Sequence, residues 1–224
     1  YFNEYGMRFS PQFLFRHFLK AWIFILGFLL FLAFVIVNKG VAIGTRDIHH
    51  FSFHLGNIYF ILFVFFFMFL PLNVFNWPKV TQTLKNKKMF IGLSVFFIIY
   101  MINFRNDNPY NQADRSWYLR NWILVYFTSS LFLKTVFFIP MAYTILSLSV
   151  TRLQNKYYYL LYPVSFLFLF PSWLIEQRYY LIPLTLFMLF RERKSSWVEY
   201  STIIGYGILS IGFINGIISN RFFL

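Results

Sequence analysis

The chain has no cysteine and few charged residues, and these two absences narrow the kind of protein it can be. Without cysteine there are neither disulfide bonds nor thiolate chemistry. Charged residues make up only 12% of the 224 residues and hydrophobic ones 59%, whereas about a quarter of a soluble domain is charged. Acidic residues are scarcer still, with 7 against 20 basic ones. The composition therefore argues against a soluble domain and favours a basic membrane protein.

The sequence also lacks the alternation of apolar and polar residues, over about ten positions, that marks the strands of a membrane β-barrel. Its apolar runs are continuous and approach the roughly 20 residues that a helix needs to cross the hydrocarbon core. The prediction is an all-α fold, a polytopic transmembrane helical bundle of about six or seven spans over residues 19–224. Residues 1–18 are too polar and basic for a signal peptide and are expected to be a cytoplasmic or interfacial lead-in.

The expected elements follow from where the apolar runs begin and end. Spans are predicted at residues 19–37, 57–75, 89–104, 131–150, 157–170, 181–190 and 202–219, and a short interfacial or re-entrant helix at 121–130. Basic loops are predicted at 77–88, 151–156 and 191–196, and three polar islands at 38–56, 105–120 and 171–180. Pro71 is expected near the end of the second span, where a helix tolerates proline or stops at it.

Basic residues are unequally divided when the chain is threaded through these spans. Twelve fall on the side of the N-terminal segment and seven on the other, and Lys134, within a span, completes the 20. Cytoplasmic loops carry the excess of Lys and Arg, so the first side is predicted to be cytoplasmic and to meet anionic lipid rather than nucleic acid. The three polar islands then lie together on the opposite, lumenal or periplasmic face, as an active site at the membrane surface requires.

The first polar island gathers charged and imidazole side chains between two apolar runs. Arg46 offers a planar guanidinium for a phosphate, and Asp47 can orient it, act as a base or accept a sugar hydroxyl. An ordinary loop salt bridge is the alternative for this pair. His49 and His54 suit contact with a sugar or phosphate, because two imidazoles without a third ligand are weak evidence for a metal site.

The second polar island combines Asp107, Asp114 and Arg115 with a group of aromatic residues. Carboxylate, guanidinium and aromatic side chains together suit a sugar phosphate. The same aromatics, Trp122 above all, suit the belt of Trp and Tyr at a membrane interface.

The third polar island places Glu176 and Arg178 just before Tyr179 and a span. Charges so close to a span are costly unless they are paired or functional. Two interpretations stay open: a buried Glu–Arg pair that locks two helices, and contact with a phosphate or another part of a substrate. Lys134 is expected to extend its amine to a lipid head group.

The first island lies in a longer stretch, residues 31–60, that resembles the dolichyl-phosphoglucose-dependent α-1,2-glucosyltransferases, which add the last glucose to the lipid-linked oligosaccharide. In that family a span ends in Asn and Gly, and a Gly, an Asp, an Arg and two spaced His follow. Arg46, His49 and His54 match these positions. Thr45 stands where the family has Asp, although an Asp follows two positions later.

Two further motifs of the same family follow in the right order. NPYNQADRSW at 108–117 matches through Pro109, Tyr110, Ala113, Asp114 and Arg115, and LIEQRYYLIP at 174–183 through Glu176, Arg178, Tyr179 and Pro183. The ending at 220–224 is also similar, so the resemblance extends over roughly residues 19–224. Three motifs in order are more specific than any one of them.

The resemblance implies a type-C membrane glycosyltransferase of the endoplasmic reticulum, with lumenal loops, a polyprenyl-phosphate sugar donor and a lipid-linked oligosaccharide acceptor. It implies neither a metal nor another cofactor, since fixed Arg side chains can neutralise the departing phosphate. The residues expected to bind substrate are Arg46, Asp47, His49, His54, Asp114, Arg115, Glu176, Arg178 and Tyr179.

The family's acidic motif, in the first lumenal loop of its N-terminal half, has no match here. The chain is therefore expected to be a C-terminal half, with the catalytic base elsewhere in the protein or on a partner chain. The alternatives are a non-catalytic scaffold subunit of a large membrane complex and a homologue that lost its catalytic half. A transporter would show repeated halves, and the sequence has no such repeat.

Overall fold

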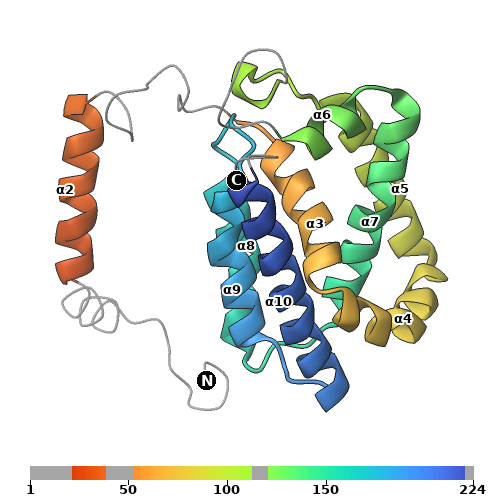
Figure 1. Ribbon diagram of the computed structural model, residues 1–224. Helices are drawn as coiled ribbons and strands as arrows, with labels where there is room; N and C mark the ends of the chain where they lie inside the picture. The colour runs from red at the N-terminus through yellow and green to blue at the C-terminus, as the bar shows by residue number, and fades with distance from the viewer. Residues whose placement is uncertain (1–21, 39–52, 113–120, 220–224) are drawn as a thin grey trace. The chain divides into compact units, whose positions relative to one another are not determined.

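The structure is a computed structural model of the 224-residue chain, and it describes residues 22–38, 53–112 and 121–219. The chain divides into two compact units, residues 1–50 and residues 51–224, which are considered separately (Figure 1). The regular elements of the described residues are helices, and their one β-bridge joins Leu153 to Arg191. The prediction of an all-α fold is thus confirmed for this part of the chain.

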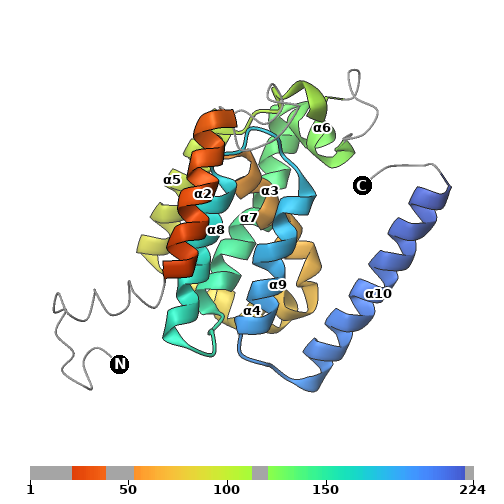
Figure 2. The same cartoon turned by 90° about the vertical axis from the view of Figure 1, so that its left-hand side faces the viewer.

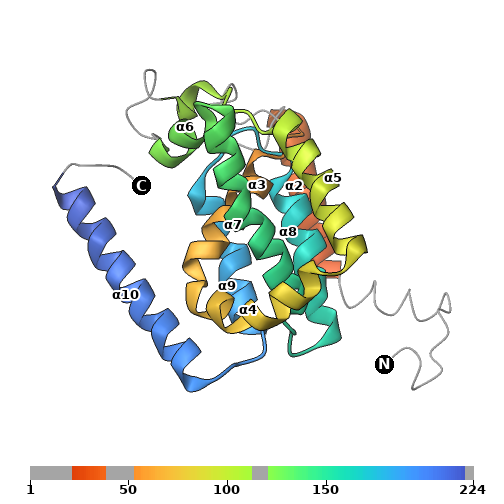
Figure 3. The same cartoon turned by 90° about the vertical axis from the view of Figure 1, so that its right-hand side faces the viewer.

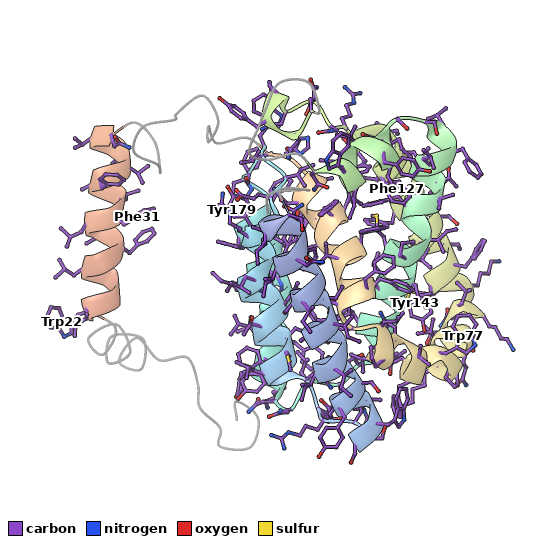
Figure 4. The ribbon with its side chains drawn as sticks, in the orientation of Figure 1. Trp22, Phe31, Trp77, Phe127, Tyr143 and Tyr179 are labelled. Atoms are coloured by element: carbon purple, nitrogen blue, oxygen red, sulfur yellow. The ribbon has the colours of Figure 1, made fainter. Side chains whose placement is uncertain are left out.

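The first unit contains helix α2, Trp22–Asn38, whose bounds are close to those of the span predicted at residues 19–37. Its exposed side chains include Ile23, Leu26, Phe28 and Leu29, whose positions lie at different angles around the helix axis. A helix that is apolar all round suits the interior of a membrane or of a large bundle. Figure 4 shows Trp22 at one end of this helix.

The second unit contains eight helices among its described residues. They are α3 (Gly56–Met68), α4 (Leu70–Leu84), α5 (Lys87–Asn103), α6 (Trp122–Thr128), α7 (Leu131–Val150), α8 (Leu161–Leu169), α9 (Leu181–Phe190) and α10 (Ser196–Ile218). Three short 3-10 turns, η1 (Pro109–Asn111), η2 (Lys156–Leu160) and η3 (Gln177–Tyr180), lie in the connections. Helices α7 and α9 have the predicted bounds, and α6 confirms the short helix before α7.

The connections of this unit alternate between two ends (Figure 1). The α5–α6 and α8–α9 connections lie beside the start of α3, and this end is called the polar-island end. The opposite end, called the basic end, holds the α4–α5, α7–α8 and α9–α10 connections. Its basic side chains are Lys85, Lys87, Lys88, Arg152, Lys156, Arg191, Arg193 and Lys194. The side views show the same division of the connections (Figures 2 and 3).

Helix α7 is central to the packing of the second unit, where it contacts α3, α4, α5 and α6. Phe63 of α3 stacks on Phe137 of α7, with ring centroids 4.1 Å apart, in a core that also contains Phe60, Tyr100 and Met141. Offset aromatic pairs add about 0.5–1.5 kcal/mol each beyond their burial. Many of the phenylalanines in this part of the chain therefore hold the helices together.

The predicted second span, residues 57–75, is not one straight helix, because the chain turns by 97° between α3 and α4. Pro71 does not end a helix: it lies in the first turn of α4, where its missing N–H is not needed. Asn73 stabilises the corner by donating through Nδ2 to the carbonyl oxygen of Phe66, at 2.9 Å. The corner makes α3 and α4 two short helices instead of one straight span.

The predicted basic loop at residues 77–88 is wrong for most of its length, because α4 continues to Leu84. Buried Asn76 donates through Nδ2 to the hydroxyls of Ser147 (3.0 Å) and Thr151 (2.9 Å) on the α7 side. Tyr143 of α7 lies beside Trp77, with ring centroids 5.9 Å apart (Figure 4). The contacts of Asn76 and Trp77 thus hold the start of this helical stretch against α7.

The number of spans, about six or seven, is not confirmed. Among the described residues only α7 and α10 are long and apolar enough to cross a membrane, with a third span if α3 and α4 count as one bent element. The span predicted at 157–170 is divided between η2 and the nine-residue α8. The last helix begins at Ser196, six residues before the predicted Thr202.

Arg191 was predicted in a basic loop, but its side chain is only 2% exposed. It donates to both carboxylate oxygens of Glu199 in α10, at 2.8 and 2.6 Å. Lys194 adds a backbone N–H to the same carboxylate at 2.9 Å. This two-point ion pair joins the end of α9 to the start of α10.

Candidate functional site

The polar-island end is organised around Asn57, a fully buried residue in the first turn of α3. Its Nδ2 donates to the carbonyl oxygens of Ser172 (3.2 Å) and Leu174 (2.8 Å). Its Oδ1 accepts from the backbone N–H of Glu176 (3.2 Å) and the hydroxyl of Tyr180 (2.8 Å). The amide thus uses both donors and both lone pairs. One side chain holds the third polar island against the start of α3.

Asn111, which is 1% exposed, joins the second polar island to the third. Its Nδ2 donates to the carbonyl oxygen of Ile175 (2.9 Å), and its Oδ1 accepts from the N–H of the same residue (3.1 Å). Asn108 caps η1 by accepting from the N–H of Tyr110 at 2.9 Å. The two islands therefore form one hydrogen-bonded layer.

His54 brings the described end of the first polar island into this layer. Its backbone N–H donates to the carbonyl oxygen of Phe170 (2.9 Å), and its Nδ1 accepts from the N–H of Gly56 (3.1 Å). The ring proton of the neutral imidazole is therefore on Nε2. That nitrogen lies 3.7 Å from Oδ1 of Asp107, which also accepts from Nε1 of Trp173 at 3.0 Å. His54 thus lies against both other islands.

Gly56 is tightly packed where α3 meets the third island. A Cβ atom built on this residue would lie 2.5 Å from Cδ1 of Ile175 and 2.8 Å from the ring of His54. No side chain fits without a shift in these neighbours. The close approach lets His54 receive the hydrogen bond from the Gly56 N–H.

Burial lowers the pKa of His54, because the imidazolium loses hydration, and the Asp107 carboxylate partly opposes this shift. The side chain of His54 is 15% exposed and that of Asp107 is 55% exposed, so the carboxylate is well hydrated and a weak partner. His54 is therefore a neutral ring near pH 7. In that form it is suited to a hydrogen bond with a sugar hydroxyl.

Glu176 and Arg178 form an ion pair from Oε1 to Nε. The Glu176 side chain is 5% exposed and that of Arg178 is 73% exposed. The two residues belong to one segment, so the interpretation of a pair that locks two helices is wrong. Within the described residues no hydrogen bond to the terminal Nη groups of Arg178 is present. A buried carboxylate thus positions a guanidinium whose outer face suits a phosphate.

Tyr179 follows Arg178 in η3 and lies at the polar-island end (Figure 4). A phenol is protonated at neutral pH, so the Tyr179 hydroxyl can donate a hydrogen bond.

The structure thus brings His54, Glu176, Arg178 and Tyr179 to one end of the second unit. The other predicted substrate-binding residues, Arg46, Asp47, His49, Asp114 and Arg115, lie outside the described residues. Within the described part of the chain no group of three or more His, Asp or Glu is placed to hold a metal ion.

Sequence analysis missed Asn57 and Asn111, which assemble the site. The available signal was an amide in the first turn of an apolar helix, where an unpaired polar group would be costly. Lys134, which is expected to extend to a lipid head group, donates through Nζ to the carbonyl oxygen of Met101 at 3.3 Å. That bond caps the C-terminal turn of α5.

Comparisons with known proteins agree with the three motifs. The DIE2/ALG10 family matches residues 6–189. A protein of Candida albicans (strain SC5314), named Dol-P-Glc:Glc(2)Man(9)GlcNAc(2)-PP-Dol alpha-1,2-glucosyltransferase, is 28% identical over 189 residues. This alignment covers 79% of the chain and 41% of the relative, so the chain spans well under half of the relative's length. No solved structure matches the chain. The resemblance predicted from the sequence is confirmed.

Proposed function

The chain belongs to the DIE2/ALG10 family, and on that premise we propose that it forms part of a membrane glucosyltransferase. The transfer would move glucose from a polyprenyl-phosphate donor to a lipid-linked oligosaccharide, as the name of the Candida relative describes for that protein. The observation that carries the proposal is the family match over residues 6–189, which includes the segments joined at the polar-island end. The missing catalytic base would come from elsewhere in the complete protein or from a partner chain.

The proposal places this protein in the membrane of the endoplasmic reticulum, with the polar-island end lumenal. The basic end supports a cytoplasmic position for the opposite side, because cytoplasmic loops carry the excess of Lys and Arg. Seven spans would be supplied by α2, the bent pair α3–α4, α5, α7, η2–α8, η3–α9 and α10. Helices α8 and α9 are short, and each is counted as a span only together with the 3-10 turn that precedes it, η2 or η3.

Arg178 is proposed to bind the phosphate of the donor. In the transfer, the bond between the sugar carbon and the phosphate oxygen breaks while a bond to the acceptor hydroxyl oxygen forms. The electron pair stays on the departing phosphate, and the hydroxyl proton goes to the base outside this chain. A fixed guanidinium stabilises the charge that develops on the phosphate. Because Glu176 holds Arg178 through Nε, the Nη groups are left for this contact. Arg46 and Arg115 are proposed to act on the same phosphate.

His54 and Tyr179 are proposed to bind sugar hydroxyls. Both are neutral near pH 7 for the reasons given above, and both are partly buried at the polar-island end. Neutral donors beside a carboxylate such as Asp107 suit a polyhydroxylated ligand. Asp47, His49 and Asp114 are proposed to contribute from the segments that adjoin this layer.

The proposal is tested by mass spectrometry of lipid-linked oligosaccharides from cells that lack the gene. Accumulation of a species one hexose short, reversed by the complete gene, is the expected result. An unchanged oligosaccharide profile would contradict the proposal and favour a scaffold role.

A further inference from the structure

A cavity of about 400 Å³ lies among α3, α7, η2, α8 and α9 of the second unit. Packed protein interiors contain few voids larger than a water molecule, and cavities of roughly 300–1,000 Å³ commonly hold ligands. The lining is mainly apolar and includes Ile61, Leu148 and Leu184. Water needs several polar partners to occupy a cavity, so these walls favour a hydrocarbon chain.

The cavity opens sideways, on the side formed by α7, η2 and α8. Its exposed lining residues are Ser149 in the last turn of α7, Tyr159 in η2 and Phe166 in α8. The wall formed by α3 and α9 is closed by buried side chains, among them Phe65 and Phe187. A chain from the bilayer can therefore enter between α7 and α8. Two of the three exposed lining residues are next to the basic end.

Two exposed basic residues are close in sequence to that part of the opening, and the amine of one of them, Lys156, lies 5.5 Å from the ring centroid of Tyr157. Arg152 follows Ser149 by three residues, and Lys156 precedes Tyr159 by three. Residues three apart in a 3-10 turn lie one above the other, so Lys156 and Tyr159 share an edge of η2. The Tyr159 hydroxyl accepts from the N–H of Leu153 at 3.4 Å, which holds the ring against the loop that carries Arg152.

Among the described residues, these two cations differ from Arg191 and Lys194 of the basic end, which have carboxylate partners. They resemble the other basic residues of that end, which are in none of the ion pairs of the described residues: Lys85, Lys87, Lys88 and Arg193. Arg191 is paired with Glu199, and Lys194 lies 3.7 Å from Glu192. Among the described residues, none of the ion pairs includes Arg152 or Lys156. The opening is therefore bordered by positive charge without a carboxylate partner in this part of the chain.

We propose that the cavity and these two cations form a binding site for an anionic phospholipid. One acyl chain fills the cavity, and the head group lies at Arg152 and Lys156. A polyprenyl-phosphate substrate would have to place its phosphate at the polar-island end, on the opposite side of the unit. The position of the charges therefore favours a lipid that is not the substrate, bound from the leaflet at the basic end. Such a lipid braces α7 against α8 and α9.

The site is tested on the complete protein in phosphatidylcholine nanodiscs. The probe is a phosphatidylserine with a diazirine at the end of one acyl chain, present in trace amount. After irradiation, the label is expected on peptides from α3, α8 and α9 that line the cavity. The same diazirine chain on phosphatidylcholine is expected to label them about tenfold less, because two basic side chains near the head group favour an anionic lipid. Equal labelling by both probes would overturn the proposal.

A cavity-filling variant distinguishes the cavity from the outer surface. Ser165→Trp places a large ring in the lining of the cavity, and Leu167→Trp places the same ring on the same helix at a position that is 67% exposed and outside the lining. Labelling of the cavity peptides is expected to be lost in the first variant and kept in the second. Equal labelling in the two would contradict an acyl chain in the cavity.

A charge variant decides the head-group position without altering the core. Arg152→Gln with Lys156→Gln is expected to remove the preference for phosphatidylserine. Lys85→Gln with Lys87→Gln, an equal charge change at exposed positions of the same end, is expected to keep it. If both pairs behave alike, the head group does not lie at Arg152 and Lys156. Displacement of the probe by a polyprenyl phosphate, but not by unlabelled phosphatidylserine, would assign the cavity to the substrate instead.

Discussion

Asn57 and Asn111 each join segments that are far apart in the sequence through amides with little or no exposure. Each replaces missing backbone partners: Asn57 serves four groups of residues 172–180, and Asn111 pairs with both backbone groups of Ile175. A buried polar group without a partner costs about 1–3 kcal/mol, so these amides are strongly constrained. They support Glu176 and Arg178 without being expected to touch a substrate.

Asn57→Ala is expected to lower the free energy of unfolding by about 2–4 kcal/mol, because it leaves several buried groups without partners. Asn103→Ala is the matched control, since Asn103 is an exposed helical residue whose amide donates to the Ile99 carbonyl oxygen of its own helix. The control is expected to change stability by less than about 0.5 kcal/mol. Thermal unfolding in detergent measures both. Equal destabilisation by the two substitutions would contradict the role given to Asn57.

The lowered pKa of His54 predicts a loss of stability in acid. The ordinary pKa of an imidazole is 6.5, and the folded protein binds this proton less readily than the unfolded chain. The stabilisation is therefore complete above pH 6.5 and is lost as the pH falls from there toward the folded pKa. His54→Asn keeps an acceptor for the Gly56 N–H but does not titrate.

The measurement is the change in thermal midpoint between about pH 7.5 and about pH 5.5, in the parent protein and in the His54→Asn variant. The parent is expected to lose more stability on acidification than the variant. The same pH dependence in both would show that the pKa of His54 does not differ between the folded and the unfolded protein, which would contradict the account.

At the scale of elements, the apolar runs predicted α7 and α9 with their observed bounds but failed at α4. The pattern at residues 77–88 is rich in Lys, Asn, Gln and Thr, which is also typical of a loop. It continues the helix that contains Asn76, whose amide donates to Ser147 and Thr151 of the α7 side, a tertiary contact that no local pattern encodes. The corner at Phe69 was missed because proline is common both near the end of a helix and in the first turn of the next one. The presence of Pro71 alone does not distinguish these two cases.

Asn76→Ala tests whether these contacts hold α4 against α7. The substitution is expected to lower the free energy of unfolding by about 1–3 kcal/mol, since the amide bonds two buried hydroxyls. Gln82→Ala, at an exposed position of the same helix, is expected to stay within about 0.5 kcal/mol. Chemical or thermal unfolding in detergent gives both values. No difference between the variants would mean that α4 is held in place by other contacts.

At the scale of the whole second unit, placing the loops on alternate sides of the predicted spans correctly separated the basic loops from the polar islands. It brought the second and third polar islands and His54 to one end, and the structure confirms this for the described residues. The order of the spans did not predict how the islands are joined, because hydrogen bonds from a side-chain amide to the backbone, such as those of Asn111, leave no periodic pattern in the sequence. The buried ion pair of Arg191 was missed for a similar reason: its partner, Glu199, belongs to the next helix.

The central claim, that Arg178 binds the donor phosphate, is tested most directly by the rate of glucose transfer in the complete protein. The assay uses polyprenyl-phosphoglucose and isolated lipid-linked oligosaccharide. Arg178→Ala is expected to lower the rate by about 10²–10³, the typical effect of removing one group that stabilises developing charge. Arg193→Ala, an exposed arginine at the basic end, is the control and is expected to keep the parent rate. Equal rates for the two variants would contradict the account.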